Sequence, residues 1–115
     1  MHRFNPLHPT EGAKEPADVR FLDLHIEPWE DNRRIRVHMR LTPFQKPPNL
    51  EAVLFDSEGD EVASVTIIEN IDFDLVFTLH IRRANTVGPF QLTGKILYEE
   101  VGTVDEKSVK FKFSL

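Results

Sequence analysis

Residues 34–41 read Arg-Ile-Arg-Val-His-Met-Arg-Leu, an uninterrupted alternation of polar and apolar side chains. Successive side chains of a β-strand point to opposite faces, so Ile35, Val37, Met39 and Leu41 share one face of an extended chain. An α-helix would distribute the same four residues around its circumference. The stretch therefore predicts a half-buried strand with its apolar face toward a core.

The same period of two recurs on both sides of this stretch. Clear alternation extends over 72–82, 90–98 and 109–115, and weaker strand patterns cover 19–27, 50–56 and 62–68. Prolines and glycines separate these segments, and Gly59 is expected to supply the positive φ of a tight turn. No segment carries the capping and periodicity of an amphipathic helix. The pattern predicts an all-β fold, a single antiparallel Greek-key β-sandwich of about seven strands.

The chain has 115 residues, which fits one domain. Residues 18–115 are predicted to form the sandwich. Residues 1–17 hold three prolines and few apolar side chains, so we expect a flexible N-terminal tail. In an alternative interpretation, the tail packs as an extended strand through Phe4 and Leu7.

The composition of the chain excludes several classes of function. The chain has no cysteine, which excludes disulfides and thiol chemistry and favours a cytoplasmic location. The net charge is −5, the sequence pI is about 5.5 and the basic residues are dispersed, so no nucleic-acid partner is expected. No apolar run reaches the ~20 residues that cross a bilayer, so no membrane partner is expected either. Cofactor and nucleophile motifs are absent, so neither a cofactor nor an enzymatic activity is predicted.

The stretch Gly88-Pro89-Phe90-Gln91-Leu92 resembles the start of strand F in immunoglobulin-like and fibronectin-type-III-like domains. Phe90 stands where those domains often have a tyrosine, and Leu92 where antibody domains have a cysteine. The chain lacks the cysteine pair, a tryptophan in its third strand and a hydroxyl at Phe90, so the resemblance is to the architecture. It implies one sheet of strands one, two and five and another of strands three, four, six and seven, and it implies no particular function.

Charged side chains mark the hairpin of the first two strands. With a turn centred near Glu30 and Asp31, we expect Glu27 opposite Arg34 and His25 opposite Arg36. The preferred interpretation is a solvated charge ladder that sets the register. The alternative is an anion site on the arginines.

Three histidines are predicted on outer faces of neighbouring strands, namely His25, His38 and His80, with Asp23 beside them. Imidazoles from adjacent strands are typical zinc ligands, so these four residues are the metal candidates. Their spacing does not match a local metal motif, and we expect unrelated surface histidines and no metal. The acidic turn at 56–61 is likewise predicted to be a polar turn, because its glycine position does not fit a calcium loop.

Apolar residues on successive positions of the third strand indicate a contact surface. Either Val53 and Phe55 or Ala52 and Leu54 are expected to face outward, and Leu97 should project from the neighbouring strand. Similarly, residues 67 and 68 are both isoleucine and cannot both face the core. Trp29 and Phe44 are either contact residues or covers over an open end of the core. The predicted interface comprises Val53, Phe55, Leu97, Ile67, Trp29 and Phe44; the alternative is that the tail or a loop covers the apolar residues.

These observations favour a non-enzymatic binding or structural module that acts through a sheet face and forms a homodimer. A small-ligand or metal-binding protein that uses the outer-face histidines is the first alternative. A hydrolase with a site built from loops is the second.

Overall fold

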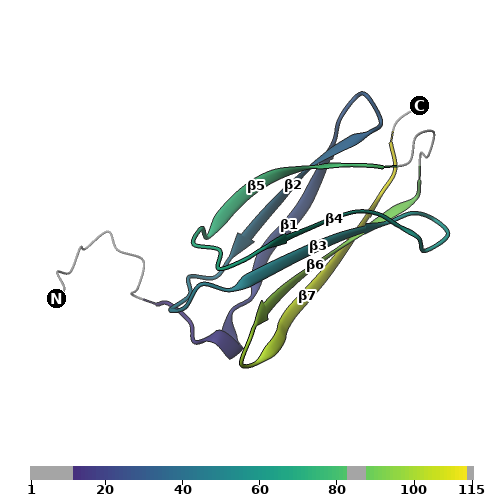
Figure 1. Ribbon diagram of the computed structural model, residues 1–115. Helices are drawn as coiled ribbons and strands as arrows, with labels where there is room; N and C mark the ends of the chain where they lie inside the picture. Colours follow the sequence, from purple (N-terminus) through teal and green to yellow (C-terminus); the bar gives the residue numbers. More distant parts are fainter. Residues whose placement is uncertain (1–11, 83–87, 114–115) are drawn as a thin grey trace.

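Strand β2 (Arg34–Leu41) forms the middle of a three-stranded antiparallel sheet, between β1 (Phe21–Pro28) and β5 (Asp74–His80). The computed structural model (Figure 1) describes residues 12–82 and 88–113. The second sheet has the order β4-β3-β6-β7, and a 3₁₀ turn, η1 (Pro16–Asp18), precedes β1. The remaining strands are β3 (Asn49–Phe55), β4 (Glu61–Ile67), β6 (Phe90–Tyr98) and β7 (Gly102–Phe111). The predicted division of the strands between two sheets is confirmed.

The core lies between the two sheets and is built by the predicted alternation. Ile35, Val37, Met39 and Leu41 of β2 are buried, and all are 1% exposed or less. From the opposite sheet, Phe90 is 1% exposed and stacks on Phe111 with ring centroids 5.3 Å apart. The fold is thus an immunoglobulin-like Greek-key β-sandwich without a disulfide.

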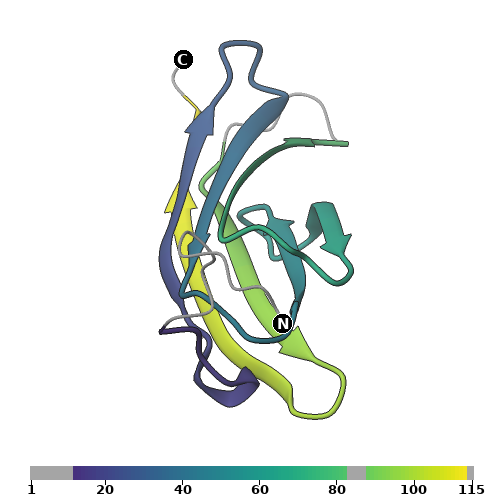
Figure 2. The ribbon, with the colours of Figure 1, turned by 90° about the vertical axis from the view of Figure 1, so that its left-hand side faces the viewer.

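The sheets are held together more closely at one edge than at the other. At the β1/β7 edge, where Figure 2 shows the two strands side by side, the Phe21 N–H donates to the Asp105 carboxylate at 2.8 Å. At the opposite edge, β4 and β5 make few contacts, and four of their inward side chains are only half-buried. These half-buried residues are Val65, Ile67, Leu75 and Phe77.

The register of the first hairpin differs from the prediction. Glu27 lies opposite Arg36, not Arg34, and His25 lies opposite His38, not Arg36. The Trp29 N–H donates to the Arg34 carbonyl at 2.9 Å, so the ladder extends one residue beyond Pro28 and the turn falls at 30–33. Asn32 takes the left-handed conformation there, with φ of 58°, which asparagine tolerates better than most residues.

Part of the predicted tail is paired with the sandwich. The Lys14 N–H donates to the Pro43 carbonyl at 2.8 Å, and the Gln45 N–H donates to the Lys14 carbonyl at 3.0 Å. Residues 1–11, with Phe4 and Leu7, lie outside the described residues, as does Leu115. The domain boundary itself stays a prediction. No helix in the described ranges has the length and apolar character to cross a membrane.

Candidate functional site

The candidate surface is the outward face of the four-stranded sheet, which we call the four-strand face. Leu50, Ala52 and Leu54 of β3 point into the core, so the alternate residues Val53 and Phe55 point outward and are half-buried. The four-strand face includes Glu51, Val53, Phe55, Thr93, Lys95, Leu97, Glu106 and Ser108, and on β4 it includes Ser64 and Thr66, opposite Val53 and Glu51. Val53, Phe55 and Leu97 were predicted as interface residues, and the structure places all three on this face.

Side chains on the four-strand face form rows across the strands. Lys95 lies between Glu51 on β3 and Glu106 on β7, directly opposite both in the strand register. In the next row Val53 lies opposite Thr93, whose hydroxyl is 2.9 Å from that of Ser108. A shallow groove of about 190 Å³ runs over these rows beside Phe55. The row of Val53, Thr93 and Ser108 is therefore small and uncharged, and the charged row lies between it and Leu97.

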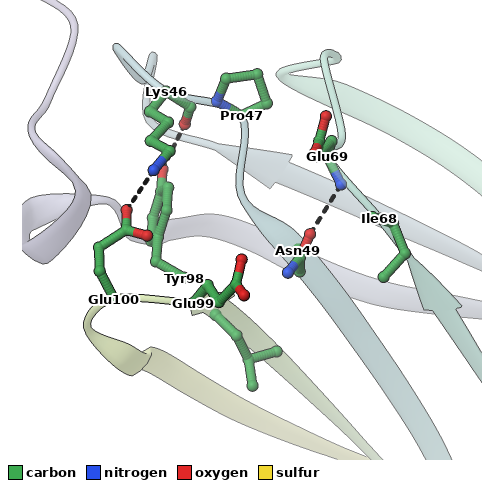
Figure 3. Close-up of a pocket in the computed structure, with 9 residues that line it drawn as sticks. Lys46, Pro47, Asn49, Ile68, Glu69, Tyr98, Glu99 and Glu100 are labelled. Atoms are coloured by element: carbon green, nitrogen blue, oxygen red, sulfur yellow. Dashed lines mark hydrogen bonds and ion pairs between the residues drawn. The ribbon is translucent and has the colours of Figure 1, made fainter.

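A cleft of about 230 Å³ continues the face at one end (Figure 3). Leu97 belongs to both, and Ile68, which is 65% exposed, also lines the cleft. The Lys46 ammonium pairs with the Glu100 carboxylate at 2.6 Å across the mouth. The Glu69 N–H donates to the Asn49 side-chain oxygen at 2.8 Å. The cleft therefore combines the apolar side chains of Leu97 and Ile68 with one ion pair and two further glutamates, Glu69 and Glu99.

Tyr98 closes the inner side of this cleft. The sequence alone does not identify it as a site residue. It is 3% exposed, and its hydroxyl donates to the Lys46 carbonyl at 2.7 Å (Figure 3). This bond joins β6 to the proline-rich segment between β2 and β3. Only the alternation in residues 90–98 indicates that Tyr98 faces inward; the distant acceptor has no signal in the sequence.

Burial and the nearby Glu100 carboxylate raise the pKa of Tyr98 to about 12. The folded state therefore disfavours the phenolate relative to the unfolded state, where the pKa is about 10. We expect this contribution to stability to be complete below pH 10 and lost as the pH rises from about 10 to about 12. Phenolate absorbance measured against pH, with urea unfolding at pH 9 and 11, checks this. Titration of Tyr98 near 10 in the folded chain would contradict it.

The other predicted interface residues lie elsewhere. Ile67 faces the core and Ile68 faces solvent, so residue 68 replaces residue 67 as the exposed member of the pair. Phe44 is 8% exposed and packs edge-on against Phe73 with centroids 4.6 Å apart. It therefore covers an end of the core. Trp29 is half-buried beneath the guanidinium of Arg34, 4.0 Å from its ring centre.

Two of the three candidate histidines meet. The His25 and His38 rings stack with centroids 4.2 Å apart, and His25 Nδ1 is 2.5 Å from the Asp23 carboxylate. His38 Nε2 is 2.5 Å from the Glu27 carboxylate, and this hydrogen bond lowers the pKa of Glu27. His80 lies opposite Arg34, four positions from His38 along β2, or roughly 13 Å at the rise of a strand. The metal hypothesis stays a prediction, and only two of its imidazoles are close together.

A different group of donors comes closest to the geometry of a metal site. Within residues 12–82 and 88–113, only Asp56, Glu58 and Asp60 bring three donor atoms within 4.8 Å of one another. The Asp56 carboxylate already accepts hydrogen bonds from the Glu58 and Asp60 N–H groups at 2.9 Å. Gly59 has a φ of 86°. This is the polar turn that the sequence predicts.

The fold defines a class, the immunoglobulin-like β-sandwiches. The structure is similar to parts of solved glycosidases. A glycosyl hydrolase family 2 member from Bacteroides cellulosilyticus gives a TM-score of 0.63 at 17% identity, over 82% of this chain and 14% of that one. Bifidobacterium dentium beta-glucuronidase gives 0.66 at 17% identity, over 84% and 18%. Ruminococcus gnavus beta-glucuronidase gives 0.56 at 17% identity, over 83% and 16%.

At these identities the likeness shows the fold alone. The chain spans less than a fifth of each of these enzymes. No protein-family model matches the sequence, and no curated protein is significantly similar to it.

Proposed function

We propose that this chain is a non-enzymatic, cytoplasmic binding module that associates with a second copy through the four-strand face. The observation that carries the proposal is the position of Val53, Phe55 and Leu97 on one outward face, continuous with the cleft at Ile68. The small side chains of the row Val53, Thr93 and Ser108 leave room for face-to-face packing of two sheets, in which the inner side chains interdigitate.

The charges on this face support a second copy as the partner. In a two-fold contact the same surface meets itself, so its charges must be self-complementary. The row Glu51–Lys95–Glu106 meets this requirement when the two-fold axis lies between Lys95 and one of the glutamates, because each copy's Lys95 then faces that glutamate of the other copy. The solved glycosidases support the term module, since in each of them a sandwich like this one forms a minor part of a longer chain.

The test is the mass of the chain in solution. We expect light scattering to give a mass of at least twice 13.3 kDa at high micromolar concentration. Val53→Glu places a charge at the centre of the contact and adds acidic charge beside Glu51. It should weaken association at least about tenfold, which corresponds to ~1.4 kcal/mol.

Val101→Glu is the matched control, because it makes the same change at a 48% exposed valine in the β6–β7 turn. It should leave the mass unchanged. A wild-type chain that stays monomeric at high micromolar concentration contradicts the proposal. So does a Val53→Glu variant that associates as strongly as the wild type.

A further inference from the structure

Strand β5 differs from the other edge strands of the sandwich. The strands β1, β4 and β7 each carry an extra, unpaired residue that bulges from the ladder, at Leu22, Val62 and Val104 respectively. Bulges disturb the regular row of backbone groups that another strand would need for pairing. The register of β5 against β2 has no such interruption from Asp74 to His80. Figure 1 shows β5 as the outer strand of its sheet.

The sequence of β5 also lacks the residues that protect edges. It reads Asp-Leu-Val-Phe-Thr-Leu-His, without the lysine or proline that commonly prevents edge pairing. By contrast, β1 ends in Pro28, and β7 carries Lys107 and Lys110. Among the strands that the structure describes, β5 is the one edge with neither kind of protection.

The backbone groups of β5 alternate between its neighbour and the open edge. The Leu41 N–H donates to the Phe73 carbonyl, and the Ile81 N–H donates to the Arg33 carbonyl, both at 2.7 Å. In an antiparallel ladder every second residue makes such bonds, so positions 75, 77 and 79 also face β2. Positions 74, 76, 78 and 80 therefore direct their N–H and C=O groups to the open edge. In the described part of the chain, β5 has no second strand partner.

Apolar side chains of β5 are correspondingly underpacked. Leu75 and Phe77 point toward the core yet are only half-buried, because β4 and β5 make few contacts. On the other face Val76 is 51% exposed. A strand added beside β5 would cover these side chains on both faces while satisfying the free backbone groups.

We propose that β5 pairs with β5 of a second copy, antiparallel about a two-fold axis at Phe77, which joins two three-stranded sheets into one. This contact is separate from the four-strand face and goes beyond the proposed function. In this register Leu75 lies opposite Leu79, and Val76 opposite Thr78. Asp74 then lies opposite His80, where the carboxylate accepts a hydrogen bond from an imidazole N–H.

Geometry selects this register. Residues that pair across the contact must lie on the same face of the sheet, so even-numbered positions pair with even-numbered ones. The free hydrogen-bonding groups belong to positions 74, 76, 78 and 80. The two-fold axis must therefore lie at a residue and not between two residues. An axis at Phe77 pairs the whole of Asp74–His80, whereas any other centre shortens the overlap. The self-complementary ends, Asp74 against His80, argue for a second copy over an unrelated strand.

Val76→Pro tests the pairing. The Val76 N–H faces the open edge, so proline removes a donor from the proposed contact and none from the β2 ladder. We expect the apparent dissociation constant to rise at least about tenfold by light scattering, with unchanged circular dichroism. Val76→Thr keeps the donor and strand propensity, and it should associate as the wild type does.

Crosslinking decides the question if Val76→Pro fails to fold. The chain has no cysteine, so a single Val76→Cys variant carries one reactive thiol. The proposed register sets the two copies of position 76 diagonally across the axis, about 7–8 Å apart. A short bismaleimide should join them in high yield. Val101→Cys, at a 48% exposed valine in the β6–β7 turn, should give little product.

The outcomes separate this contact from the four-strand face. Weaker association of Val76→Pro, or selective crosslinking at position 76 where that variant is unfolded, supports β5 pairing whatever Val53→Glu does. A folded Val76→Pro with wild-type association overturns the β5 pairing and leaves the four-strand face standing if Val53→Glu dissociates. Where Val76→Pro is unfolded, equal crosslinking at positions 76 and 101 overturns it. A monomeric wild type overturns both proposals and leaves the β5 edge for a strand of another protein.

Discussion

Phe90→Ala is expected to lower the free energy of unfolding by about 3–5 kcal/mol, the range for truncating a fully buried aromatic residue. The ring is 1% exposed, stacks on Phe111 and meets Phe113 edge-on with centroids 5.6 Å apart. Truncation removes these contacts and leaves a cavity between rigid strands. A domain of this size has a total stability of roughly 5–15 kcal/mol, so the variant should be close to unfolding. Urea denaturation followed by circular dichroism measures the loss.

Phe55→Ala is the control for this prediction. It removes the same side chain from the outward face of β3, where Phe55 is only half-buried. The free energy of unfolding should fall by less than half as much as in Phe90→Ala, because truncating a side chain at the surface leaves little cavity. Equal losses would mean that Phe90 is less important to the core than its burial indicates. The comparison must be made at a concentration where both variants are monomeric, because association adds to apparent stability.

The alternation of polar and apolar residues in 34–41 and 90–98 predicts most of the fold. An alternation with a period of two predicts which side chains face inward. The buried residues between Ile35 and Leu41 follow this prediction position by position. The division of the strands between two sheets came from the resemblance at Gly88–Leu92, since alternation does not identify a strand's neighbours. Surface residues that share the alternation, such as Val53 and Phe55, were found by the same means.

Features that depend on a difference of one residue in the length of a turn could not be predicted from the sequence. The first hairpin turns one residue further along the chain than expected, with Asn32 in the left-handed conformation, and two isoleucines in succession do not indicate that Ile68 is the exposed one. Because an edge bulge such as that at Val62 depends on the partner strand, the unprotected state of β5 also emerges only from the paired structure. The Tyr98–Lys46 bond joins residues 52 positions apart, and nothing local indicates it.

Gly94→Val is expected to destabilise the fold by about 1–3 kcal/mol through overpacking. Gly94 lies on the inward side of β6, opposite the first sheet. A Cβ atom there would meet the Phe21 ring at 3.2 Å, a Leu24 methyl at 3.3 Å and the Met39 methyl at 3.4 Å. Valine adds two methyl groups beyond this already tight Cβ position, so the sheets or the three side chains must shift to accommodate them. Thermal unfolding compared with the wild type measures the effect.

A double-mutant cycle with Leu24→Ala shows whether crowding is the cause. Leu24→Ala alone should destabilise the fold, because Leu24 is 8% exposed and belongs to the core. In the double variant the valine methyls occupy the space that the leucine leaves, so the combined loss should be smaller than the sum of the single losses. Additive losses would contradict the crowding account and point instead to the backbone of β6. Gly94→Ala, which adds only the Cβ atom, should have a smaller effect than Gly94→Val, because flexible side-chain ends such as the Met39 methyl can move by a few tenths of an ångström.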